Sequence, residues 1–130
     1  MPHEARGFWG KSQRAAVAAR TLFEQKDAEG AINRAYYAMF DAARAALDVV
    51  DPELAMAKTH NTILRRFNMY IVMQQGLDRA LGRALRMAEK SRLVADYDRE
   101  PASMEEAGAV LEDMDAMLSA VEAFLVGGPV

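Results

Sequence analysis

The chain has 130 residues, no cysteine and a formal net charge of −3. This length fits one domain that buries roughly two-thirds of its unfolded surface, and the lack of cysteine excludes both disulfides and thiolate metal sites. No stretch reaches the roughly 20 apolar residues of a membrane helix, and the first residues lack the apolar run of a secretory signal. We therefore expect a soluble, cytoplasmic protein with no membrane partner.

Apolar residues recur at helical spacing over nearly the whole chain, and no segment alternates as a strand would. The first predicted helix covers residues 11–25. The second begins after an N-cap at Asp27 and ends at Asp51-Pro52, because proline cannot continue a helix. Its expected buried stripe is Ile32, Tyr36, Met39, Phe40, Ala43 and Leu47.

Two further helices are predicted in the middle of the chain. The third opens at Lys58-Thr59-His60, and Gly76 is its expected C-terminal stop. The fourth starts at Leu77. Gly82 lies inside it, where the missing side chain permits a close helix contact.

Pro101 separates the fourth helix from a fifth. Ser103 and Glu106 form a capping box that opens this last helix. The connections are short, which favours antiparallel neighbours. The sequence therefore predicts an all-α, up-and-down antiparallel bundle of four to five helices, with one domain over residues 1–130 and a core at about 10–125.

Charge is distributed unevenly along the chain. Residues 1–57 carry a net −1, residues 58–92 a net +6 and residues 93–130 a net −8. A concentrated positive segment attracts phosphate, so nucleic acid or nucleotide is a candidate partner. The alternative is that the acidic C-terminal helix packs beside the basic segment and neutralises it within the monomer.

Steps of four along the fourth helix extend its inward face to Arg92 and Asp96. An inward guanidinium needs a carboxylate, which either Asp96 or Asp41 can supply. The arrangement predicts either a functional site or a buried salt bridge that closes the end of the bundle. Tyr97 converges with Arg92 only if the helix unwinds near Ala95.

The second helix carries a polar face beside its apolar stripe. Arg34, Tyr37, Asp41 and Arg44 fall on this side, where they could line a cleft or a subunit interface. For Tyr37 alone, ordinary packing at the border of the core is the favoured interpretation.

Lys58 and His60 stand at the start of the third helix, where free backbone N–H groups and the helix dipole favour anions. This predicts a phosphate site. A lone histidine on an apolar stripe is more often a partly buried, hydrogen-bonded residue than a catalyst, so a structural role for His60 is the alternative.

Three short motifs follow one another along the chain: Arg34-Ala35-Tyr36-Tyr37-Ala38-Met39-Phe40, Lys58-Thr59-His60 and Arg92-Leu93-Val94-Ala95-Asp96-Tyr97. In this order they resemble the HEPN superfamily, particularly its small stand-alone prokaryotic members, over roughly residues 10–125. The resemblance implies a helical bundle that forms a homodimer. It also implies a small nucleotidyltransferase as cognate partner, in a toxin–antitoxin or defence pair.

Many HEPN members resemble metal-independent endoribonucleases, in which an arginine and a histidine four to six residues later meet at the dimer interface. This chain departs from that pattern, because Tyr97, Asp98 and Arg99 follow Arg92 where the histidine is expected. A tyrosine with the usual pKa of about 10 is a poor base at neutral pH. The departure puts ribonuclease activity in question.

Two functions remain open. The first, favoured by the missing histidine, is a HEPN protein that binds nucleotide or RNA and docks a nucleotidyltransferase. The second is an active endoribonuclease toxin, in which Arg92 clamps the phosphate, Asp96 orients Arg92 and Tyr97 donates or accepts a hydrogen bond. Neither function needs a metal or cofactor, and the chain has no Glu-x-x-His motif for a di-metal bundle. The expected nucleotide or phosphate contacts are Arg34, Tyr37, Lys58, His60, Arg65 and Arg66.

Overall fold

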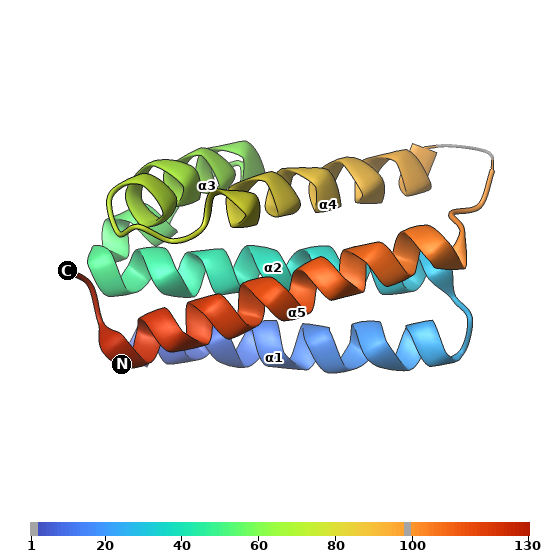
Figure 1. The fold of residues 1–130 in the computed structure, drawn as a ribbon, viewed down its shortest axis with the longest axis horizontal. Helices are drawn as coiled ribbons and strands as arrows, with labels where there is room; N and C mark the ends of the chain where they lie inside the picture. Colours follow the sequence, from blue (N-terminus) through green and yellow to red (C-terminus); the bar gives the residue numbers. More distant parts are fainter. Residues whose placement is uncertain (1–2, 98–99) are drawn as a thin grey trace.

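The computed structural model describes the backbone of residues 3–97 and 100–130, and the side chains of residues 6–94 and 100–130. α1, α2, α4 and α5 run along the long axis of the molecule in alternating directions, while α3 lies at one end (Figure 1). No strand occurs in these described ranges, and the predicted all-α antiparallel bundle is confirmed. The elements are α1 (His3–Glu24), α2 (Ala28–Val50), the 3-10 turn η1 (Pro52–Ala55), α3 (His60–Arg66), the π-helical segment η2 (Phe67–Met73), α4 (Arg79–Tyr97) and α5 (Met104–Gly127).

Side-chain caps fix the starts of three helices. Asp27 accepts a hydrogen bond from the backbone N–H three residues later at 2.9 Å, and Ser103 does the same at 3.0 Å. Both caps were predicted and are confirmed. Thr59 caps α3 in the same way at 3.3 Å, so that helix begins at His60.

The first helix is longer than predicted. α1 begins at His3 rather than near residue 11, and Phe8 and Trp9 pack against the core. Gly7 and Gly10 flank these two aromatic residues and weaken the helical propensity of the segment. Packing of the aromatic side chains outweighs that local preference, because tertiary contacts supply most of the stability of a helix in a protein.

The third predicted helix ends where expected but is not uniform. Gly76 has a φ of +83°, the left-handed conformation that suits a C-terminal glycine. Between Arg66 and this stop the chain widens into η2. A Cβ added at Gly82 of α4 would lie 2.7 Å from Oδ1 of Asn68 in η2, which confirms the close contact expected at this glycine.

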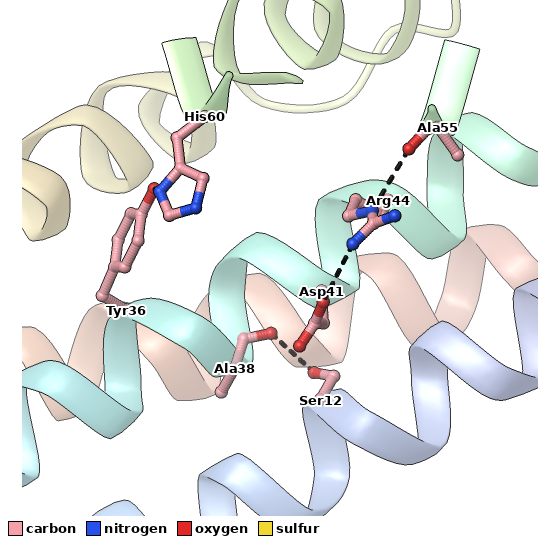
Figure 2. A network of polar contacts seen from close by, with 7 residues as sticks. All are labelled: Ser12, Tyr36, Ala38, Asp41, Arg44, Ala55 and His60. Atoms are coloured by element: carbon pink, nitrogen blue, oxygen red, sulfur yellow. Dashed lines mark hydrogen bonds and ion pairs between the residues drawn. The ribbon is translucent and has the colours of Figure 1, made fainter. Parts of the chain in front are cut away.

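α2 is the central helix of the bundle and packs against α1, α3, α4 and α5. Its many alanines let neighbouring helices approach closely, and the predicted buried stripe is buried throughout. Ser12 of α1 is fully buried and donates a hydrogen bond to the carbonyl oxygen of Ala38 at 2.6 Å (Figure 2). This hydrogen bond joins α1 to α2 inside the core.

The acidic helix α5 makes its ion pair with α1 in the described part of the chain. Nη2 of Arg20 lies 2.7 Å from Oδ1 of Asp115, and both side chains are about half exposed. Arg20 lies outside the basic segment 58–92, whose Arg65, Arg79 and Arg83 are exposed. The ion pairs between described residues thus give no support to neutralisation of the basic segment by α5.

Candidate functional site

Tyr36 lies at the centre of a polar cluster that joins three helices. Its ring is fully buried in α2, and its hydroxyl donates a hydrogen bond to Oε2 of Glu89 on α4 at 3.2 Å. Nδ1 of His60, the first residue of α3, lies 3.1 Å from the same hydroxyl (Figure 2). A phenol has a single proton, and here it is given to the carboxylate. Nδ1 of His60 must therefore carry a proton and donate to the phenol oxygen.

This hydrogen bond fixes the tautomer of His60. With the proton on Nδ1, a neutral imidazole keeps a lone pair on Nε2. No residue in the described ranges makes a hydrogen bond to Nε2. The ring is thus oriented by one nitrogen, while the other is available as a hydrogen-bond acceptor or a base.

Burial and neighbouring charges separate the roles of Tyr36 and His60. Burial raises the pKa of Tyr36 far above its usual range, and the adjacent Glu89 carboxylate raises it further. Burial lowers the pKa of His60, and the positive charge of Arg92 lowers it further. Tyr36 consequently stays protonated as a donor, and His60 stays neutral at physiological pH.

Aromatic rings surround the imidazole. The ring centroid of His60 lies 4.4 Å from that of Phe40 and 5.8 Å from those of Tyr36 and Tyr37. The two tyrosine rings contact each other edge to face at 5.2 Å. Side chains at adjacent positions on a helix diverge by about 100°. Both tyrosines still contact His60, because the imidazole lies at the boundary between the two faces of α2 that they occupy.

Arg92 approaches the same tyrosines from α4. Its Cζ lies 4.9 Å from the ring centroid of Tyr36 and 5.6 Å from that of Tyr37, within the range of cation–π attraction. The guanidinium therefore faces α2, as predicted from the helical spacing. The ion pair of Asp41, a predicted partner of Arg92, is instead made with Nη1 of Arg44 at 4.0 Å.

The side chains of Asp96 and Tyr97 are not among those that the structure describes, so their predicted roles stay predictions. The backbone of α4 continues as a helix to Tyr97. It thus lacks the unwinding near Ala95 on which convergence of Tyr97 with Arg92 depends.

The predicted phosphate contacts of the third helix have different surroundings. Lys58 and Arg65 are exposed. Arg66 donates hydrogen bonds to the carbonyl oxygens of Leu54 and Met56 at 3.1 and 2.9 Å. Its guanidinium thereby holds the connection after η1 against α3, which is a role in the fold.

The polar face of α2 borders a cavity of about 320 Å³ between α1 and α2. Arg34, Tyr37 and Asp41 line it, which agrees with the predicted cleft. Arg44 does not line this cavity. It stacks on the ring of Phe8 at 4.2 Å and donates to the carbonyl oxygen of Ala55 at 3.1 Å.

Sequence analysis missed Lys11 and Arg14 of α1, which line the cavity from the other side, and Glu89. Glu89 stands four residues after the buried Leu85 and three before Arg92, so helical spacing places all three on one face. That spacing could have indicated Glu89. No spacing within one helix could have indicated which residues of α1 face Arg34.

The described residues hold neither a cluster of metal ligands nor a helix suited to a membrane. No group of three or more histidine, cysteine, aspartate or glutamate side chains gathers there into a possible metal site. None of the helices, over its described length, combines the length and apolar character that crossing a bilayer requires.

Two known proteins and one family model match most of this chain. A Methanocaldococcus jannaschii protein named "Putative toxin MJ0605" is 29% identical over 105 residues, which cover 81% of this chain and 76% of that protein. A Gloeobacter violaceus protein named "UPF0332 protein glr0978" is 28% identical over 97 residues, which cover 75% of each. The family model of the HEPN domain matches residues 5–124. The chain therefore belongs to the HEPN domain family.

Proposed function

We propose that this HEPN protein is a toxin-like, metal-independent endoribonuclease whose active site combines Arg92 with His60. One observation supports this proposal above all. The side chains of Arg92 from α4 and His60 from α3 both contact the rings of Tyr36 and Tyr37. The similarity to a protein named as a putative toxin supports the toxin-like part of the proposal. In this proposal α3 supplies the histidine that the superfamily pattern places shortly after the arginine.

The chemistry follows from the charge and protonation of the two groups. Nε2 of His60 accepts the proton of a ribose 2′-hydroxyl, and the resulting oxygen attacks the adjacent phosphorus. The bond from phosphorus to the 5′-oxygen breaks, and that oxygen takes a proton from water. Arg92 stabilises the negative charge that develops on the non-bridging oxygens. The products are a 2′,3′-cyclic phosphate and a 5′-hydroxyl.

The test is cleavage of a labelled RNA oligonucleotide by the purified protein in a metal chelator. Two substitutions at His60 remove the imidazole base and each keep one side-chain donor. In His60→Asn the side-chain amide retains a donor near the position of Nδ1, and in His60→Gln it retains one near Nε2. Neither amide is a base, so both variants should lose cleavage by about 100-fold or more.

Arg92→Gln removes the charge and should lower the cleavage rate by about 100-fold. Arg86→Gln is its matched control, since Arg86 is an exposed arginine of the same helix that donates to Asn61 at 3.2 Å. Thermal melting of each variant checks that it is folded. Unchanged cleavage in folded His60→Asn would refute the role of Nε2.

The second candidate function is a nucleotide-binding HEPN protein that docks a cognate nucleotidyltransferase and does not cut RNA. Exposed apolar side chains on α4 favour it, because Met87, Leu93 and Val94 lie close to Arg92 along the helix and are 55%, 39% and 48% exposed. In this case the protein binds RNA or nucleotide and leaves RNA intact. Light scattering on the purified chain, alone and mixed with a nucleotidyltransferase, distinguishes a homodimer from a complex of the two.

A further inference from the structure

The cavity between α1 and α2 combines three cationic side chains with one carboxylate. Lys11 and Arg14 stand three positions apart on α1, and Arg34 faces them from α2. Ala15 and Ala18 also line the cavity, and their short side chains leave its volume of about 320 Å³ open. In the described part of the chain, none of the three cations makes a hydrogen bond or ion pair with another side chain.

The balance of charge in this cavity favours an anion. Asp41 is its single carboxylate, and burial raises the pKa of this group, although the positive charges of Arg44 and Lys11 oppose the shift. Three cations facing one carboxylate leave the cavity positive. A phosphate fits the cations, while the carboxylate can accept hydrogen bonds from a ribose hydroxyl or a base amino group.

Tyr37 connects this cavity to the Arg92–His60 site. Its side chain lines the cavity, and its ring also lies 5.6 Å from Cζ of Arg92 and 5.8 Å from the ring of His60. The cationic cavity and the guanidinium of Arg92, with an aromatic ring between them, match the pattern of surfaces that bind single-stranded nucleic acid. There, positive charge follows the backbone and bases stack on aromatic rings.

We propose that Lys11, Arg14 and Arg34 form a second phosphate subsite, which holds the backbone phosphate next to the one at Arg92. The ligand is then a single-stranded oligonucleotide rather than a mononucleotide, and its intervening base contacts Tyr37. The placement of the first phosphate rests on the proposed function. Binding at the second subsite does not depend on cleavage.

The test measures the affinity of uncleavable 2′-O-methyl RNA by fluorescence anisotropy. The purified protein should bind a tetranucleotide at least tenfold more tightly than a dinucleotide, because the longer ligand reaches both subsites. The double variant Arg14→Gln/Arg34→Gln should lose most of this difference. Its slope of log affinity against log salt should fall by about 0.7, since the subsite holds one phosphate and each phosphate contact with a single strand contributes about 0.7.

Arg20→Gln serves as the matched control. Arg20 is an exposed arginine of α1 whose guanidinium pairs with Asp115 on α5. This variant removes one positive charge from α1 outside the cavity, as Arg14→Gln does inside it. Its affinity for the tetranucleotide should match that of the unmodified protein. If Arg20→Gln weakens tetranucleotide binding as much as the double variant does, the loss reflects overall charge and the proposed subsite is wrong.

Two further outcomes separate the subsite from the proposed function. If RNA is not cleaved but the tetranucleotide still depends on Arg14 and Arg34, the ribonuclease proposal fails and the subsite stands. If RNA is cleaved but the tetranucleotide binds no tighter than the dinucleotide, or the double variant binds it equally well, the subsite is wrong.

Discussion

Replacement of Tyr36 by phenylalanine removes the hydroxyl that His60 and Glu89 share. The ring stays buried, so little apolar contact is lost. The hydrogen bonds at 3.1 and 3.2 Å disappear, and Nδ1 of His60 and Oε2 of Glu89 lose a partner. Both of these residues are only partly buried, so water replaces some of the contact. We expect Tyr36→Phe to lower the free energy of unfolding by about 1.5 kcal/mol, near the lower end of the cost of unsatisfied buried groups.

For a chain of this size that loss corresponds to a fall in Tm of about 5–7 °C. Calorimetry measures it, and Tyr70→Phe is the matched control. Tyr70 is also partly buried, and its hydroxyl makes no hydrogen bond with the described residues. Nitrogen NMR of the imidazole provides a second measurement, since the proton of His60 should reside on Nδ1 in the unmodified protein and lose that preference in Tyr36→Phe.

Two results would refute this account of the site. If Tyr36→Phe melts at the same temperature as the unmodified protein, the shared hydroxyl contributes nothing to stability. If the proton of His60 resides on Nε2 in the unmodified protein, that nitrogen has no free lone pair and cannot act as the proposed base.

Three other changes test different parts of the structure. The pKa of His60 lies below its usual 6.5, so the unfolded chain binds the proton more readily than the folded one. The free energy of unfolding should therefore fall as the pH drops through and below 6.5. Denaturant titrations at several pH values should show this fall, and it should be absent in His60→Asn. Ser12→Ala removes the buried hydrogen bond to Ala38 and should lower the free energy of unfolding by about 1 kcal/mol in urea titrations. A clearly larger loss would show that the hydroxyl belongs to a wider network and would contradict the single hydrogen bond. Gly82→Ala should stabilise the protein by about 0.5 kcal/mol in the same assay, because the exposed side chain of Asn68 can rotate away and helix propensity then favours alanine; a loss of stability would show that Asn68 cannot move.

Local sequence information was sufficient for most of the helical framework. Asp27 and Ser103 mark helix starts because each cap is formed within four residues of sequence. The buried stripe of α2 follows from spacing alone. The start of α1 was not predictable in this way, since Phe8 and Trp9 are held by the core and local propensity at Gly7 and Gly10 opposes a helix there.

The candidate site depends on contacts between distant segments, and its prediction was correspondingly incomplete. Helical spacing indicated that Arg92 faces inward, but it could not show that His60 meets the same tyrosines. The distance along the chain between Arg92 and His60 is therefore a poor guide to their distance in space. Lys11 and Arg14 were missed for a similar reason, because their position opposite Arg34 depends on the register between α1 and α2.

The π-helical segment η2 has a consequence for how the chain tolerates changes of length. Its wider turns, seen in the hydrogen bond from the N–H of Gln74 to the carbonyl of Met69 at 3.3 Å, hold more residues than an α-helix of the same rise. Loss of one residue there can be absorbed by a return to ordinary α-helical pitch, and α4 then keeps its orientation. A deletion inside α2 would instead rotate everything beyond it by about 100° and separate the tyrosines from Arg92.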